Sequence, residues 1–161
     1  MPIAVGDRLP NVTLRQLTPE GITEVTTAEL FANKKAILFA VPGAFTPTCS
    51  DRHLPGFVTN ADALRAKGYD LIACVAVNDP FVMGAWSKVS QVGDKVVMLS
   101  DGNAELVKAL GLELDASGFG LGLRSKRYVM VLDDGKVTDL RVEANPGAVE
   151  VSGAEALLAG A

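Results

Sequence analysis

The chain is organised around residues 36–50, AILFAVPGAFTPTCS. Residues 36–41 form an unbroken apolar run of strand length, and Pro42-Gly43 ends it. Thr46 has the residue type of a helix N-cap, and Pro47 suits the first helical position because its missing N–H would have no partner there. The pattern predicts a buried strand, a turn and a helix that starts just before Cys49.

Cys49 lies in the first turn of that predicted helix, where backbone N–H groups lack intrahelical partners and favour a negative charge. A helix terminus stabilises such a charge by about 0.3–1 kcal/mol, and one pKa unit is about 1.4 kcal/mol. The terminus alone therefore lowers the thiol pKa from ~8.5 by about one unit. A pKa near ~6 also needs a cation close to the sulfur, so the chain must supply an arginine.

Composition limits the classes of protein to consider. With 161 residues, 48% of them apolar, we expect one domain over 1–161. The formal charge is −4 and no basic stripe is present, which argues against a nucleic-acid partner. No apolar run approaches the ~20 residues of a membrane span, and no signal peptide is apparent. We expect a soluble, cytoplasmic protein, with an organellar location after removal of a transit peptide as the alternative.

The cysteine and histidine counts narrow the chemistry further. Two cysteines do not make a disulfide scaffold, and a single histidine, His53, argues against a His/Cys metal site. We therefore predict neither a metal nor a cofactor.

Strands and helices alternate along the rest of the chain. Strands are predicted at 12–14, 36–41, 71–77, 96–99, 128–132 and 136–142, and helices at 27–31, 57–67, 80–89, 103–110 and after Ser152. This alternation, closed by a hairpin at Asp133-Asp134-Gly135, predicts an α/β three-layer domain with a central mixed sheet flanked by helices.

Four local features carry further expectations. Pro55 predicts a break near Leu54, with helix resuming at Gly56 or Phe57. Ser152 to Glu155 has capping-box spacing. Residues 112–123 are glycine-rich and read as a mobile or binding loop. The apolar set of the helix after Asp79 comprises Phe81, Val82, Ala85, Trp86 and Val89.

The pattern Pro42-x-x-x-Thr46-x-x-Cys49 resembles the peroxidatic motif of the peroxiredoxins, which have a thioredoxin-like fold. The runs 41–50, 53–57, 77–82 and 124–128 are similar to the type II, or peroxiredoxin-5-like, branch, in order and at matching spacing. The resemblance covers nearly the whole chain.

This resemblance implies a thiol peroxidase that reduces hydrogen peroxide and alkyl hydroperoxides through a Cys49 sulfenic acid, with a role in peroxide detoxification and redox homeostasis. Thr46 would hydrogen-bond the thiolate and the peroxide, Pro42 would shield the pocket, and Arg127 would be the required cation. The family also implies a homodimer whose contact lies near Phe45 and residues 80–82.

The reductant depends on how Cys74 is interpreted. It is either a small apolar residue of a buried strand or a resolving cysteine. Some members of the branch carry a resolving cysteine near the C-terminal hairpin, but residues 150–152 contain none. This favours an external reductant, either glutathione with glutaredoxin or thioredoxin.

Several residues keep two interpretations. Arg127 could be a surface charge, Arg124 could share its role or merely pair with an acidic residue, and His53 could orient the site or simply be packed or solvated. Gly43 and Phe45, beside the motif, are further pocket candidates, and the loop with Phe119 forms either an apolar lip or an ordinary connector.

Two other functions remain as alternatives. A general thiol–disulfide oxidoreductase lacks support because Cys-x-x-Cys is absent. A peroxide-sensing redox switch that uses Cys49 oxidation would be compatible with the same residues.

Overall fold

The computed structural model describes residues 2–160, apart from the side chains of Cys49 and Asp51. Its strands are β1 (Thr13–Thr18), β2 (Gly21–Thr26), β3 (Lys35–Ala40), β4 (Leu71–Ala76), β5 (Val97–Ser100), β6 (Glu113–Asp115), β7 (Leu123–Ser125), β8 (Tyr128–Asp133) and β9 (Lys136–Val142). Its helices are α1 (Thr27–Phe31), α2 (Leu54–Ala66), α3 (Pro80–Val89), α4 (Glu105–Leu110) and α5 (Ala154–Gly160), with a π-helix at Cys49–His53 and a 3₁₀ turn at Ser117–Phe119.

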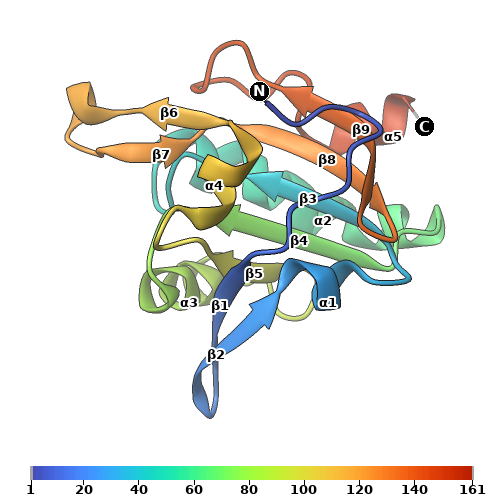
Figure 1. Cartoon of the computed structure of the whole chain (residues 1–161), viewed down its shortest axis with the longest axis horizontal. Coiled ribbons are helices and arrows are strands. Elements are labelled where there is room, and N and C mark those ends of the chain that lie inside the picture. Colours follow the sequence, from blue (N-terminus) through green and yellow to red (C-terminus); the bar gives the residue numbers. More distant parts are fainter. Residues whose placement is uncertain (1, 161) are drawn as a thin grey trace.

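A seven-stranded mixed sheet forms the middle layer, in the order β2-β1-β5-β4-β3-β8-β9 (Figure 1). The three central strands β3, β4 and β5 are parallel, while β1 and β8 pair with them in the antiparallel direction. Figure 1 shows α4 in front of this sheet and α2 behind it. The predicted three-layer α/β architecture is confirmed.

Both faces of the sheet are covered, which explains why its central strands are continuously apolar. In β3, Ile37 and Phe39 pack in the core shared with α2, α3 and α5, whereas Leu38 and Ala40 pack in the core shared with α1 and α4. This alternation follows from the two-residue period of a strand. The strand is therefore held from both sides, and its carboxyl end is a rigid support for residues 42–49.

The helix around Pro55 differs from the prediction. The π-helix passes directly into α2. Helix α2 begins at Leu54 and not, as predicted, at Gly56 or Phe57. Pro55 lies in the first turn of α2, where its missing N–H costs little. The irregularity is the π-helix itself, which precedes the proline and contains Cys49. A π segment of this kind is rare and is frequently found at functional sites.

The predicted apolar set of α3 is only partly buried. Met83 and Trp86 lie in the core, but Phe81 and Val89 are 61% and 72% exposed and Ala85 is exposed as well. Asp79 caps this helix as predicted, because its Oδ1 accepts from the N–H of Val82 at 2.8 Å. One face of α3 therefore presents apolar side chains to the surface.

Two further expectations need correction. Residues 112–123, predicted as a mobile or binding loop, include strand β6, which pairs with β7 in a hairpin that projects from the body of the molecule (Figure 1). Helix α5 begins at Ala154, so Gly153 and not Ser152 directly precedes it, and the Ser152 hydroxyl donates to Glu143 Oε2 at 2.6 Å. The hairpin at Asp134 and Gly135 is confirmed, with φ of 50° and 80° as this tight turn requires.

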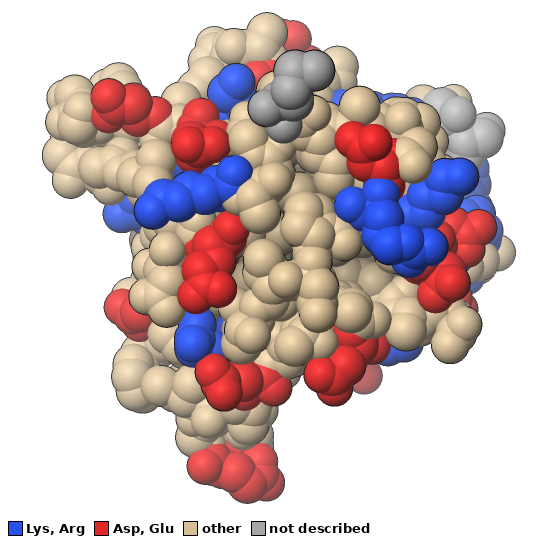
Figure 2. Space-filling model, in the orientation of Figure 1, with Lys and Arg blue, Asp and Glu red and all other residues tan. Residues whose placement is uncertain are grey.

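The face of the molecule in Figure 2 carries acidic and basic side chains that are interspersed, with no continuous basic stripe. No helix in the described part of the chain has the length and apolar character needed to cross a bilayer.

Candidate active site

The backbone around Cys49 has the predicted geometry. Pro42 and Gly43 are buried at the end of β3, and helical conformation begins at Pro47. The N–H of Ser50 donates to the carbonyl of Thr46 at 2.9 Å, so the first turn closes immediately after the predicted cap. The Thr48 hydroxyl donates to the carbonyl of Gly147 at 2.9 Å and ties this turn to the segment after β9. Cys49 is thus placed at the start of a helical segment on a rigid support.

Arg127 is fully buried, with 1% of its surface exposed, directly before β8. Its Nε donates to the carbonyl of Pro146 and its Nη1 to Nδ1 of His53, each at 2.9 Å. The interpretation of Arg127 as a surface charge is therefore wrong. A guanidinium held at two of its nitrogens has a fixed orientation, as an electrostatic role requires.

His53 is the group that holds one side of this guanidinium. Its Nε2 donates to the carbonyl of Ser152 at 2.9 Å, which leaves Nδ1 as the acceptor for Arg127. Burial, and secondarily the charge of Arg127, lower the pKa of His53 to about 3. The imidazole is therefore neutral at physiological pH, and the interpretation of His53 as solvated is wrong.

A cavity of about 330 Å³ brings the predicted residues together. Its lining comprises Pro42, Thr46, Pro47, Thr48, Leu114, Asp115, Ala116, Phe119, Leu121, Arg127, Asn145, Pro146 and Gly147. The hydroxyl of Thr46 donates to the carbonyl of Gly43 at 2.8 Å, so its oxygen can also accept a hydrogen bond. Phe119, predicted at the lip of the pocket, is 88% exposed at its edge.

Four pocket candidates do not line this cavity. His53 lies behind Arg127, as described, and Phe45 lies outside, 48% exposed, with its ring 6.4 Å from that of Trp86. Gly43 lies against Arg124, whose Nη1 would be 3.0 Å from a Cβ at that position. Arg124 itself donates to the carbonyls of Leu121 and Val77, at 2.9 and 3.2 Å. It therefore anchors the β6–β7 hairpin to the end of β4.

Comparison with known proteins assigns the family. The redoxin family profile matches residues 4–158. The chain is 55% identical over 161 residues to peroxiredoxin-2E-2, chloroplastic, of Oryza sativa, covering 97% of this chain and 71% of that protein. It is 49% identical over 158 residues to peroxiredoxin-2C of the same plant, covering 98% and 97%. The chain belongs to the type II peroxiredoxins.

Solved structures agree with this assignment. The peroxiredoxin superposes with a TM-score of 0.93 on reduced Prx3 of Vibrio vulnificus in complex with hydrogen peroxide, at 58% identity over 98% of each chain. It superposes on peroxiredoxin 5 of Alvinella pompejana with a TM-score of 0.81, at 40% identity over 89% of this chain and 91% of that one. The thioredoxin-like fold and the activity class, a thiol peroxidase, are thereby confirmed.

Cys74 lies at the centre of β4, opposite Phe39 of β3 and Met98 of β5. Its side chain is 0% exposed and lies inside the core that includes Ile37 and Trp86. This environment is that of a small apolar side chain rather than of an accessible thiol.

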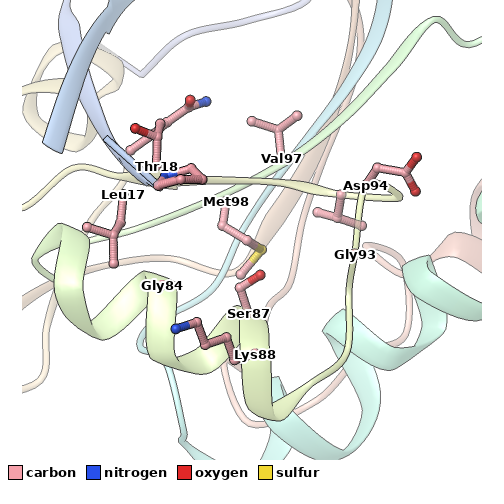
Figure 3. Close-up of a pocket in the computed structure, with 12 residues that line it drawn as sticks. Leu17, Thr18, Gly84, Ser87, Lys88, Gly93, Asp94, Val97 and Met98 are labelled. Atoms are coloured by element: carbon pink, nitrogen blue, oxygen red, sulfur yellow. The ribbon is translucent and has the colours of Figure 1, made fainter. Parts of the chain in front are cut away.

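Another cavity, of about 620 Å³, lies between β1, α3 and β5 (Figure 3). Its side chains include Leu17, Ser87, Lys88, Asp94 and Met98, and among the described side chains that line it there is no cysteine. Among the residues that the structure describes, no group of three or more His, Cys, Asp or Glu side chains is arranged to hold a metal ion.

Sequence reasoning missed Glu143, Pro146 and Ser152, which hold the predicted residues in place. The acceptor of Arg127 Nε is a backbone carbonyl, and the partners of Glu143 are largely backbone N–H groups. Backbone partners leave no trace in residue types, so the sequence carries no signal for them. Only Glu143, an acidic residue at the end of an alternating strand, could have been singled out.

Proposed function

We propose that Cys49 is the nucleophile of this thiol peroxidase and that Thr46, Pro42 and Arg127 form its catalytic surroundings. The observation that supports this most directly is the shared cavity, because Pro42, Thr46, Thr48 and Arg127 line one space and Cys49 follows Thr48 in the same helical turn.

The reaction follows from thiolate chemistry. The Cys49 sulfur attacks one oxygen of the hydroperoxide, the S–O bond forms as the O–O bond breaks, and the leaving oxygen takes up a proton and departs as water or an alcohol. Sulfur is oxidised to sulfenic acid and the peroxide is reduced. A thiol then attacks the sulfenic sulfur, releasing water, and a second thiol frees Cys49 as a disulfide forms between the two reductant sulfurs.

Arg127 has two roles in this proposal. Its charge favours the thiolate over the thiol, and it stabilises the negative charge that develops on the departing oxygen. The bonds described for it go to a carbonyl and to a neutral imidazole, and neither acceptor cancels its charge. A buried guanidinium is screened little by water, so its effect on the cavity is strong.

Thr46 is proposed to hydrogen-bond the peroxide. Its hydroxyl proton is directed to the Gly43 carbonyl, so the oxygen presents lone pairs with which it can accept the O–H of a hydroperoxide. In this arrangement Thr46 orients the substrate. Pro42 covers the side of the cavity next to β3 and has no N–H to compete for the sulfur.

The substrates proposed are hydrogen peroxide and alkyl hydroperoxides. Leu114, Phe119 and Leu121 add an apolar wall to the cavity from the β6–β7 hairpin. An apolar wall adds no binding free energy for hydrogen peroxide, which has no apolar part, but it can bury the alkyl part of an organic hydroperoxide.

The reductant proposed is an external thiol, either glutathione with glutaredoxin or thioredoxin. The burial of Cys74 supports this choice, because a resolving thiol must reach the sulfenic sulfur and Cys74 is enclosed in the core. The second cysteine is thus left with a packing role.

The assembly proposed is a homodimer formed through the apolar patch of Phe45, Phe81, Ala85 and Val89. These side chains are exposed, and Phe45 contacts the Trp86 ring from the side of the active-site loop. An exposed apolar face of this kind is typical of a protein contact.

The location proposed is cytoplasmic, with an organellar location as the alternative. The alternative has support from relatives, since the peroxiredoxins that are 55% and 53% identical to this chain are chloroplastic proteins of Oryza sativa and Arabidopsis thaliana.

The test is stopped-flow oxidation followed by the fluorescence of Trp86, the only tryptophan, whose Nε1 donates to the hydroxyl of Ser50 at 3.0 Å. Cys49→Ser should abolish the peroxide-dependent change. Arg127→Lys should lower the rate constant by about 10²–10³-fold, as expected for loss of a transition-state donor. Arg52→Lys, an exposed arginine in the same π-helix, is the matched control and should leave the rate unchanged. A wild-type rate in Arg127→Lys would refute the assignment.

A further inference from the structure

Glu143 is a buried carboxylate that lies outside the cavity but next to its supports. It follows β9, and only 6% of its surface is exposed. Its Oε2 accepts the N–H groups of Glu150, Val151 and Ser152 at 2.8–2.9 Å and the Ser152 hydroxyl at 2.6 Å. Four donors on one oxygen are far more than a surface carboxylate needs, so the arrangement has the form of a built site.

The protonation state of Glu143 agrees with this geometry. Burial raises the pKa of its carboxyl, but the hydrogen bonds from Ser152, Val151 and Glu150 outweigh burial and lower the pKa below its ordinary value. The group is therefore an anion at neutral pH, and the segment 150–152 is folded around a negative charge.

Ser152 transmits this constraint to the active site. Its N–H and hydroxyl are bonded to Glu143, and its carbonyl accepts from His53 Nε2 at 2.9 Å. This bond fixes the His53 tautomer, so that Nδ1 accepts from Arg127 Nη1. All four side chains in the chain from Glu143 to Arg127 are 6% exposed or less. Water therefore does not compete for these bonds.

The main chain also connects Glu143 to Arg127. The N–H of Glu143 donates to the carbonyl of Arg127 at 2.9 Å, beside the last pair of the β8–β9 ladder, Tyr128 and Val142. Glu143 thus reaches Arg127 along two routes, one through the main chain and one through Ser152 and His53. A change of the Glu143 side chain acts on the route through Ser152 and His53.

We propose that Glu143 is a positioning residue for peroxide reduction, which acts through Ser152 and His53 to set the orientation of the Arg127 guanidinium. The inference rests on the role of Arg127 proposed above. Glu143 touches neither the cavity nor the substrate, and it is not a catalytic residue.

The test is Glu143→Gln, which keeps the length of the side chain and removes its charge. Because a displacement of about 1 Å at a catalytic group can cost about 10²-fold, we expect kcat/KM for hydrogen peroxide to fall by ten- to a hundredfold. The pH profile of Cys49 alkylation by iodoacetamide should shift upward by about one unit, since the thiolate loses part of its cation. Glu150→Gln, an exposed carboxylate in the same segment, is the matched control and should change neither.

A double-mutant cycle with Arg127→Lys separates an effect on the position of Arg127 from a general disturbance of the structure. If Glu143 acts through Arg127, the effect of Glu143→Gln on kcat/KM disappears in the Arg127→Lys background. An additive loss in that background, or an unchanged alkylation profile, would overturn the inference.

If Glu143→Gln does not fold, His53→Phe interrupts the same link while keeping a ring against Phe39 and Phe57, 4.9 and 5.7 Å away. It should give the same shift in the alkylation profile, and its absence would again overturn the inference. If Arg127→Lys alone leaves the rate unchanged, the proposed function fails instead, so the two failures are distinguishable.

Discussion

Acid sensitivity of the folded state should come from His53. This histidine is the only one in the chain, and it is buried and neutral with a pKa of about 3. In the unfolded chain it regains a pKa near ~6.5. The unfolded state therefore binds a proton as the pH falls below that value while the folded state does not, so the free energy of unfolding falls with pH.

The magnitude follows from the linkage relation. Between pH 7 and pH 5 the unfolded imidazole goes from about one-quarter to almost fully protonated, while the folded one stays neutral. At about 1.4 kcal/mol per pH unit below pH 6.5, the folded protein loses about 2 kcal/mol over this range. The loss continues until the pH approaches the folded pKa of about 3.

The assay compares urea unfolding of Cys49→Ser with that of Cys49→Ser/His53→Phe from pH 7 to pH 5, at one protein concentration, by Trp86 fluorescence. The Cys49→Ser background removes the titration of the thiol, and the carboxyl groups common to both proteins cancel in the difference. The difference in unfolding free energy should narrow by about 2 kcal/mol on acidification. A difference that stays constant would mean that folded His53 titrates normally, and the buried Arg127–His53 bond would then be refuted.

Three other substitutions test separate parts of the structure. Cys74→Ala should keep the rate of turnover with an external thiol within twofold of the wild-type rate. In the wild type, one equivalent of peroxide should leave one thiol that can still be titrated. Loss of both thiols in a monomer would contradict the packing role of Cys74. Phe119→Ala should slow reduction of cumene hydroperoxide about fivefold, close to 1 kcal/mol, while the rate with hydrogen peroxide stays the same, and equal effects on both would argue against an apolar substrate wall. Phe81→Asp should convert a dimer to a monomer in sedimentation velocity, whereas Phe119→Asp, at an even more exposed aromatic residue, should not.

The central strands of the sheet were predictable because each carries its own signal, whereas β2 was not among the predicted strands. The runs at 36–41 and 71–77 are continuously apolar since both faces of the central strands are covered, and Asp134-Gly135 has the composition of a tight hairpin turn. Helix α3 was less predictable. Its start follows from Asp79 and Pro80, but residue types alone do not tell which apolar side chains of the helix face the core, and Phe81 and Val89 of the predicted apolar set are exposed.

In the candidate site, only the side chains to which the proposed chemistry assigns a direct role could be predicted from the sequence. The need for a cation near Cys49 came from the energetics of a thiolate, and the resemblance pointed to Arg127. The depth of its burial, and the neutral state of His53, depend on residues 145–152 folding back over the π-helix. Such long-range backbone contacts are set by tertiary packing, and local patterns do not contain them.

His53 and the Ser152 peptide separate Arg127 from Glu143, and this separation has an electrostatic consequence. A buried guanidinium costs several kcal/mol in desolvation unless an opposite charge or good hydrogen bonds compensate it. A direct Arg127–Glu143 ion pair would supply that compensation, but it would also cancel much of the positive field that a thiolate and a departing oxygen require. With neutral His53 and the Ser152 peptide between them, the anion lies in the same buried region, and the two hydrogen bonds described for the guanidinium go to uncharged acceptors. An acidic residue in place of His53 would therefore be expected to stabilise Arg127 and to weaken the peroxidase, because the same contact that satisfies the cation removes its influence on the sulfur.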